Sequence, residues 1–381
     1  MMPSSDCERE DDQTSAEPLL EKTEAAYPAP LLRRQYMAAV AIITPILLFI
    51  LSFLWALNGK LFKSSSSDNV CQQPAVRQEW RTLSSSERLE YIRAVNCLSS
   101  IPSTLCDGSL HDEFAYIHRN VGEYSHEAAP FLPWHRYFIH IYEQTLKLRC
   151  DYKGSLLYWD WTRDSANLSQ APVWDATEGF GGNGNLNSDM TIGDGYCVED
   201  GPFAGLEVQY YNEDWNPHCL SRGLLTGAFL DHFGAQQVNS SVVAAVLDAP
   251  DYYSFLLMLE DGPHSSIPII VRGDFLRFTA PNDPIFFLHH AQIDRLWWKW
   301  QRQDPAVRML SYNGPTRTNS SIAAQLTDLI EMDGLASDIS ASSVMSVDRS
   351  ILCYKLGTET KRTVRGHAVQ QTYLSCTLQS V

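Results

Sequence analysis

The sequence predicts a mainly α-helical domain with long loops, preceded by one transmembrane helix. Three histidines lie at uneven spacings in an aromatic, helix-forming stretch, residues 114–146. Downstream, Asn282, Asp283 and Pro284 form a strong helix start, with Asp as the cap and Pro at the first helical position. Residues 37–57 are 21 consecutive uncharged and mostly apolar residues. As a helix they would span roughly 31 Å, close to the roughly 30 Å hydrocarbon core of a bilayer.

The N-terminal region divides into three segments before the folded domain. Residues 1–26 carry eight acidic side chains against two basic ones, so residues 1–36 are predicted to form a solvated acidic tail. A cleaved signal peptide has a basic region near the N-terminus and a shorter apolar run. Because 36 residues precede the apolar run, we expect residues 37–57 to be a retained signal anchor. The serine-rich residues 58–70 are expected to be a stalk, and residues 71–381 the folded domain.

Cysteines and glycosylation sequons predict the orientation of this anchor, because the flanking basic residues are balanced on the two sides. Eight of the nine cysteines follow the apolar run, which suggests disulfides in an oxidising compartment. Three sequons, beginning at Asn167, Asn239 and Asn319, also follow it. We therefore expect a single-pass membrane protein with a cytosolic N-terminus and a lumenal or extracellular domain.

The overall charge excludes one class of partner. The net charge is −16 and the isoelectric point is near 5.1, whereas a nucleic-acid partner requires a basic face. Nucleic acid is therefore not an expected partner, and small neutral molecules or peptides remain open as substrates.

The three histidines of the first stretch are His118, His126 and His135. Metal-binding histidines on a single helix lie three or four residues apart, whereas gaps of eight and nine imply two helices and a loop that converge on one point. Neutral imidazole suits copper, zinc and iron. Three imidazoles also leave an open position for a small molecule, as a reactive metal site requires.

The residues around these histidines resemble a sequence motif of a known family. FLPWHR followed by an aromatic helix is similar to the copper A motif of the type-3 copper proteins, which are tyrosinases, catechol oxidases and haemocyanins. That family holds a second copper on three more histidines downstream. The segment that begins at Leu259 resembles the copper B motif, HNxxxH or HxxxH followed by DPxFxxHHxxxD. It reads LEDGPHSSIPIIVRGDFLRFTAPNDPIFFLHHAQID. His264 fits its first ligand and His290 its third, while His289 takes the adjacent position.

The copper B half departs from the family pattern twice. The middle ligand is expected one helical turn after His264, on the same face, where the chain has Pro268. The usual Asn after the first ligand is Ser265. Proline offers no donor atom and disfavours helix in the residue before it. We therefore expect copper B to keep two histidines, with a water, His289 or a more distant histidine filling the gap, and activity on free tyrosine to be low.

Further residues match the family outside the ligands. Glu260, one turn before His264, resembles a glutamate that orients a water near copper B, and is the expected catalytic residue. Arg77 and the Tyr312–Gly314 segment resemble an Arg and a Tyr-x-Gly that bracket the core of short fungal tyrosinases. Tyr124 stands where some relatives have a Cys bonded to the second ligand, so no thioether is expected.

The remaining elements have structural interpretations. Ser84 and Glu87 are at capping-box spacing before an amphipathic helix. Helices are also expected over residues 134–148 and 285–301. The aromatic residues of 158–161 are expected in the core, and the glycine-rich residues 179–195 form a loop without the Lys-Ser/Thr ending of a phosphate site. The other histidines are expected to be structural or exposed: His111, His140, His218, His232 and His367.

The resemblance covers roughly Cys71 to Gly314. It implies an antiparallel four-helix core holding two copper ions, and oxidation of a phenol or catechol by dioxygen. Small membrane-anchored fungal members resemble tailoring enzymes of peptide secondary metabolism, so the phenol is either free or the tyrosine of a peptide. Two alternatives stay open: a zinc-loaded relative, and a degenerate member without oxidase activity because Pro268 replaces a copper B histidine.

Overall fold

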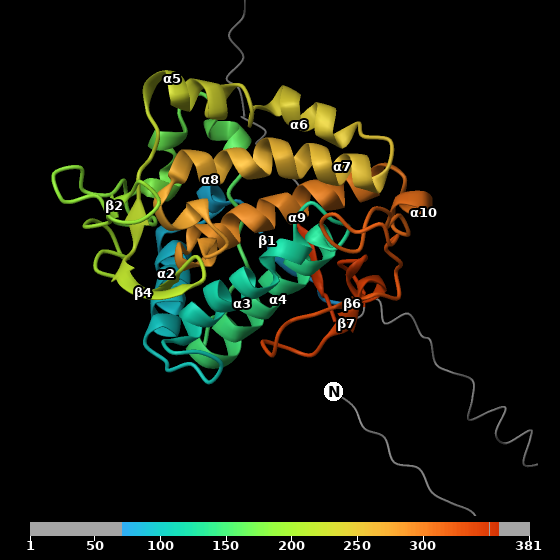
Figure 1. Ribbon diagram of the computed structural model, residues 1–381, viewed down its shortest axis with the longest axis horizontal. Coiled ribbons are helices and arrows are strands. Elements are labelled where there is room, and N and C mark those ends of the chain that lie inside the picture. The colour runs from blue at the N-terminus through green and yellow to red at the C-terminus, as the bar shows by residue number, and fades with distance from the viewer. Residues whose placement is uncertain (1–70, 350, 358–381) are drawn as a thin grey trace, which may run out of the picture. The chain divides into compact units, whose positions relative to one another are not determined.

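The computed structural model describes residues 71–349 and 351–357 (Figure 1). The predicted tail, anchor and stalk lie outside the described residues, as do His367 and Cys376. Within the described part of the chain, none of the helices combines the length and the apolar character that a membrane span requires.

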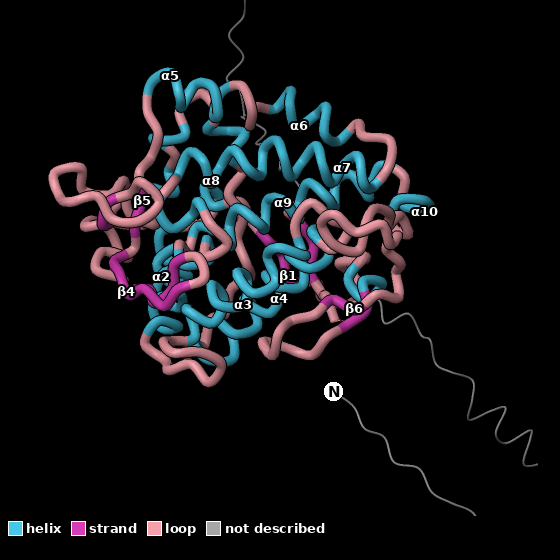
Figure 2. Tube along the Cα trace, in the orientation of Figure 1, coloured by secondary structure: helices cyan, strands magenta, loops and turns pink. Residues whose placement is uncertain are grey.

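Helices dominate the described domain, and the strands are short segments among long loops (Figure 2). The α-helices are α2 (Ser85–Ser99), α3 (Leu110–Ser125), α4 (Phe131–Cys150), α5 (Gly227–Leu230), α6 (Ser240–Leu247), α7 (Tyr252–Leu259), α8 (Ser265–Val271), α9 (Ile285–Gln303) and α10 (Pro305–Arg308). Two π-helical turns, η5 (Asp231–Ala235) and η6 (Glu260–His264), follow α5 and α7. The 3-10 turns are η1 (Trp80–Thr82), η2 (Trp161–Asp164), η3 (Leu168–Gln170), η4 (Pro172–Trp174), η7 (Gly273–Leu276), η8 (Ala280–Asn282) and η9 (Ala341–Val344).

The strands form two-stranded pairs. The strands are β1 (Ala75–Arg77), β2 (Tyr196–Cys197), β3 (Glu207–Tyr211), β4 (Asp214–Cys219), β5 (Ser221–Arg222), β6 (Leu329–Ile330), β7 (Ile339–Ser340) and β8 (Tyr354–Leu356). β1 pairs with β8 in parallel, while β2–β5, β3–β4 and β6–β7 are antiparallel. The β1–β8 pair joins the beginning of the described domain to its end.

The predicted helix starts occur close to the expected residues. The capping box at Ser84 and Glu87 is present at the start of α2. α9 begins at Ile285 as predicted, but its N-cap is Pro284 rather than Asp283. The Asp283 carboxylate still accepts a hydrogen bond from the Ile285 N–H, at 3.2 Å. α4 begins at Phe131, three residues earlier than expected.

Asp283 also takes part in a contact, through Arg222, between the start of α9 and the glycine-rich loop. Arg222 donates to both carboxylate oxygens of Asp283, at 2.7 and 2.8 Å. The same guanidinium donates to the carbonyls of Phe180 and Gly181. Residues 179–195 are therefore a loop, as predicted, and its carbonyls help to hold the start of α9.

The helix α9 is fixed along its length by a buried ionic network. Asp294 accepts hydrogen bonds from Arg77 (3.0 Å), Arg136 (2.5 Å) and the Tyr354 hydroxyl (2.6 Å). Arg77 is fully buried and also pairs with Glu143 at 3.1 Å. The Arg77 guanidinium lies over the ring of Tyr354 of β8, 3.6 Å from its centroid. One carboxylate thus connects β1, α4, α9 and β8.

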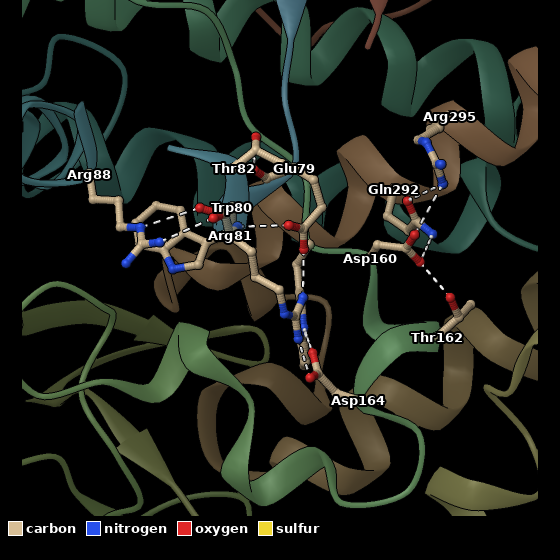
Figure 3. Close-up of polar contacts among 11 residues, drawn as sticks. Glu79, Trp80, Arg81, Thr82, Arg88, Asp160, Thr162, Asp164, Gln292 and Arg295 are labelled. Carbon is tan, nitrogen blue, oxygen red and sulfur yellow. Dashed lines mark hydrogen bonds and ion pairs between the residues drawn. The ribbon is translucent and has the colours of Figure 1, made fainter. Parts of the chain in front are cut away.

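A second polar cluster joins α9 to residues 158–161, whose aromatic side chains are buried as predicted. Asp160 accepts hydrogen bonds from Gln292 of α9 (3.0 Å) and from Thr162 (2.6 Å), and lies 3.5 Å from Arg295 (Figure 3). In the same view Arg81 bridges Glu79 and Asp164. The Asp160 contacts hold the middle of α9 against residues 158–161.

Disulfides link segments of the domain that are distant in sequence. In the described residues the pairs are Cys71–Cys353, Cys97–Cys150 and Cys197–Cys219, and Cys106 is a free thiol. The prediction of disulfides among the cysteines that follow the apolar run is therefore confirmed.

Replacing Asp294 should destabilise the domain strongly. Asp294→Asn removes the shared anion from two buried guanidiniums, and breaking a buried pair in this way costs about 3–5 kcal/mol. The free energy of unfolding, measured in urea at fixed metal content, should fall by that amount. The control is Glu90→Gln in the exposed Glu90–Arg93 pair, which should cost at most about 1 kcal/mol. Equal losses in the two variants would contradict the role of Asp294.

Candidate metal centre

His118, His126 and His135 come together in space, and we call them the first triad. His118 lies on α3, His126 caps the end of that helix, and His135 lies in the first turns of α4. One ligand nitrogen from each lies within 4.8 Å of the others. The ring centroids of His118 are 5.3 Å from both His126 and His135, and those two are 4.9 Å apart. The loop between the two helices therefore closes a triangle of imidazoles, as predicted.

Backbone carbonyls orient the rings of the first triad. In each ring Nδ1 donates to a carbonyl oxygen, which fixes the tautomer and leaves Nε2 free to bind a metal. The bonds run from His118 to Phe278 (2.5 Å), from His126 to Gly122 (2.9 Å) and from His135 to Phe131 (2.7 Å). The Nε2 atoms of His118 and His135 are 3.1 Å apart. Two nitrogens on one ion at about 2.0–2.1 Å would lie roughly 2.9–3.4 Å apart.

His264, His289 and His290 form the second triad, and their ligand atoms also lie within 4.8 Å of one another. His289 and His290 are successive residues of α9. His264 is the last residue of the π-helical turn η6, which contains Pro263 and a kink at Gly262 with φ −92° and ψ −107°. Single π-helical turns within helices are frequent at functional sites. The turn places His264 opposite the two histidines of α9.

The triads lie side by side. The rings of His135 and His290 stack with centroids 4.3 Å apart and planes within 9°, and His126 lies 6.1 Å from His264. A cavity of about 390 Å³ opens onto both, and histidines of both triads line it. Its volume is within the usual range for a small-molecule site.

Burial keeps the imidazoles neutral. It lowers the pKa of His118 and of His289 to about 3 and that of His126 to about 4. The pKa values of the other three are held well below the usual value by burial first and by neighbouring imidazoles second; they are His135, His264 and His290. Neutral imidazole is the form that binds a metal.

Comparison with known proteins agrees with this geometry. The model of the common central domain of tyrosinase matches residues 109–303. The chain belongs to the tyrosinase family. It is 43% identical over 320 residues to the tyrosinase-like protein phomQ1' of Diaporthe leptostromiformis, which covers 79% of this chain and 84% of that protein. It is 41% identical over 285 residues to the tyrosinase ustQ of Aspergillus flavus, covering 74% and 80%.

A more distant relative and one solved structure extend the comparison. The N-acetyl-6-hydroxytryptophan oxidase ivoB of Emericella nidulans is 31% identical over 368 residues, covering 80% of this chain and 99% of that one. A polyphenol oxidase variant from Thermothelomyces thermophila superposes with a TM-score of 0.67 at 29% identity, over 75% of this chain and 89% of that structure. The helix-rich fold of this tyrosinase-family chain is thus that of a copper oxidase.

The family implies a pair of copper ions, and the residues present fit them. Six neutral imidazoles form two separate triangles, and imidazole is a ligand that suits copper. Three buried ring nitrogens of the second triad have no hydrogen-bond partner in the described chain, namely both of His289 and Nδ1 of His290. A metal ion in this triangle could satisfy one nitrogen of His289.

The second triad contains one of the groups expected to fill the gap at position 268. Pro268 lies inside α8, and the helix continues through it although proline disfavours helix in the residue before it. His289, which was expected from sequence alongside a water or a more distant histidine, has a ligand atom within 4.8 Å of those of His264 and His290. Ser265, at the usual Asn position, donates its hydroxyl to the Glu260 carbonyl at 2.7 Å. That hydroxyl satisfies the backbone of the kinked turn.

Glu260 connects the two halves of the site. Both of its carboxylate oxygens accept from the Glu127 N–H, at 3.0 Å each. Glu127 follows His126 and has a left-handed φ of 51°, which points its N–H at Glu260. Burial raises the pKa of Glu260 well above its usual value, and the nearby Asp261 and Glu127 charges raise it further, against the Glu127 hydrogen bond. Glu260 also lines the cavity.

Residues that carry no motif complete the cavity. Phe278 supplies the carbonyl for His118, and its ring packs so closely on Gly122 that a Cβ there would lie 2.6 Å from it. The ring of Phe286 lies 4.2 Å from His290 and 5.0 Å from His118. The glycine at 122 is the one sequence signal for the position of Phe278.

The other described histidines, His111, His140, His218 and His232, lie outside both triads. His111 is buried and bonds to the Asn282 carbonyl at 2.9 Å. His218 bonds to Asp274 at 3.0 Å. Burial lowers the pKa of His218, but the hydrogen bond and charge of Asp274 outweigh it and raise the pKa. Asp274 also accepts from Asn282, at 2.8 Å, so it fixes the loop that leads to Phe278.

Replacing a histidine of the first triad should remove one metal ion. In His118→Ala, His126→Ala and His135→Ala, the copper content per chain should fall by about half. Losing a ligand is a larger change than losing a group that orients one, and the latter already costs about 10–100-fold in affinity. The control is His232→Ala, an exposed histidine outside both triads. Unchanged copper in all three variants, measured by elemental analysis, would show that these residues do not bind it.

Proposed function

We propose that the chain is a copper-dependent oxidase that uses dioxygen to oxidise a phenol or catechol. The observation that carries this proposal is the pair of imidazole triads that open side by side onto one cavity. Copper bound in both triads would supply the redox chemistry by which dioxygen accepts the electrons of the phenol. The helices α3, α4 and α9, together with α8, which directly follows the ligand-bearing turn η6, are proposed to form the antiparallel core around the metals.

The cavity walls suit an aromatic substrate. Phe278 and Phe286 flank the histidines, and Phe275 packs at 5.8 Å from His289. These rings exclude water and offer an apolar surface to a phenol ring. Glu260 is the carboxyl group placed to accept the phenolic proton, because it is buried, faces the cavity and has a raised pKa that favours proton uptake.

The rim of the cavity favours a substrate without negative charge. Three exposed carboxylates, Glu127, Glu213 and Asp261, line the cavity together with one exposed cation, Arg277. None of them has an ion-pair partner in the described chain. Like charges disfavour each other, so a free carboxylate on the substrate should weaken binding.

A tyrosine held in peptide linkage meets this condition, because its amino and carboxyl groups are neutral amides. The relative ivoB is named for a hydroxylated aromatic amino acid whose nitrogen is acylated, so its substrate agrees with a peptide linkage on the amino side only. We therefore propose a peptide tyrosine or a related amide, in secondary metabolism, as the substrate of this chain. The alternative is an inactive or zinc-loaded relative. Pro268 favours loss of activity because it replaces a copper B histidine of the family motif, and zinc is open because imidazole sites also accept it.

Oxygen uptake tests the proposal. The copper-loaded protein should consume dioxygen with a neutral catechol and with a tyrosine-containing peptide amide, and more slowly with free tyrosine. Glu260→Gln should keep the copper content and lower kcat on the phenol by about 10²–10⁴-fold, the usual contribution of a positioned proton acceptor. Glu207→Gln, an exposed carboxylate on β3, is the matched control. A fully copper-loaded protein that consumes no dioxygen with any phenol would refute the function.

We also propose that this oxidase is a single-pass membrane protein with a lumenal or extracellular catalytic domain. The support is the apolar run at residues 37–57 together with the disulfides of the domain that follows, since cytosolic proteins rarely keep disulfides. Of the three sequons, Asn167 and Asn319 are exposed. The side-chain amide of Asn239 caps α6 and donates to the Ala235 carbonyl at 2.6 Å.

Protease protection tests this orientation. In sealed microsomes, added protease should remove the short acidic tail and leave a fragment of nearly full size. A glycosidase should then shorten the fragment, with glycans on Asn167 and Asn319 rather than on Asn239, whose amide is already bonded. Detergent should make the whole chain digestible. Complete digestion without detergent would place the domain on the cytosolic side.

A further inference from the structure

We propose that His289 is the third protein ligand of the second copper, in place of the histidine that the family motif has at position 268. This inference rests on the copper chemistry proposed above. Position 268 is one turn after His264, where a side chain on the same helix face would reach the metal. Pro268 lines the cavity there but carries no donor atom.

The size of the second triad is the first argument. Its ring centroids are 5.3 Å apart for His264 and His289, and 5.1 Å for each of the other two pairs. The first triad, in which every member fits its family motif, has sides of 5.3, 5.3 and 4.9 Å. Two triangles of nearly equal size result only when His289 is counted as the third corner.

The ring of His289 is the second argument. It is fully buried, and neither of its nitrogens has a hydrogen-bond partner in the described chain. A buried polar atom left without a partner costs about 1–3 kcal/mol, so a structural histidine normally finds one. His111 differs in degree, because its Nε2 bonds to the Asn282 carbonyl and only its Nδ1 is without a partner. A copper ion on one nitrogen of His289 would remove this cost at that nitrogen.

Helix geometry lets neighbouring residues share one ion here. Successive side chains leave an α-helix about 100° apart, yet the ligand atoms of His289 and His290 lie within 4.8 Å of each other and of that of His264. Both rings face His264, which approaches from the kinked turn η6 on the opposite side. Phe275 and Trp161 pack against the ring of His289 and hold its orientation. Two ligands therefore come from the rigid helix α9 and one from the π-helical turn.

Four proteins test the assignment: the wild type, His289→Ala, Pro268→His, and the double variant. Each is measured for copper per chain, for copper retention against a chelator, and for the EPR signal of isolated Cu(II), which a coupled pair of ions lacks. His289→Ala should lower the affinity for the second copper by more than about 100-fold, because the loss of a ligand exceeds the loss of a group that orients one. The remaining copper in the first triad should then give the isolated-ion signal.

The double variant separates ligation from a structural role. An imidazole at position 268 lies where the family motif has its ligand, so it should restore the second copper in the absence of His289. Pro268→His alone should change copper per chain little, because the site already has three imidazoles. His111→Ala, which removes a buried histidine outside both triads, should retain both ions.

Three outcomes would overturn the inference. The first is full retention of the second copper in His289→Ala, and the second is failure of the double variant to regain it. The third is a wild type that binds one copper while Pro268→His binds two. These outcomes are distinct from failure of the proposed function, which is a protein with both coppers and no oxidation of any phenol. Recovery in the double variant together with loss in the single variant supports the assignment, whatever the activity.

Discussion

The buried ion pair between Arg136 and Asp294 fixes the relative position of the two halves of the site. Arg136 follows His135 on α4, and Asp294 lies one turn after His290 on α9. The rings of His135 and His290, one from each triad, stack against each other. A shift between α4 and α9 would therefore break the pair and separate the triads together. Removing these charges from water costs free energy, but the buried pair fixes the register between α4 and α9.

Much of the site could be predicted from sequence, because metal ligation depends on a few side chains at fixed spacing. The first triad is complete at the predicted residues, and His264, His290 and Glu260 lie at the cavity. The helix start near Asp283 was also predictable, since its cap chemistry is local. What local chemistry could not provide was the partner of Asp283, because Arg222 is distant in sequence and has no motif of its own.

Two features of the second triad depend on tertiary contacts. Pro268 disfavours helix in the residue before it, yet α8 continues through it, and the kinked π-helical turn η6 lies four to eight residues earlier. His289 was one of three groups expected to fill the gap at position 268, beside a water and a more distant histidine. In this chain the pattern is altered at 268, and the position of His289 depends on the packing of Phe275 and Trp161 around its ring. Residue spacing alone predicts neither the course of α8 through Pro268 nor the position of the His289 ring.

The disulfide between Cys71 and Cys353 has a consequence for how the domain tolerates damage. It links residues 282 positions apart, so nearly the whole described domain is a closed covalent loop. A single peptide-bond cut in any loop inside it, such as residues 179–195, opens the loop without producing a separate fragment. The two ligand-bearing halves stay on one molecule, and their reassociation remains intramolecular, at an effective concentration that two free fragments would not reach. The domain can thus be nicked in a protease-rich environment and still retain both halves of its metal centre.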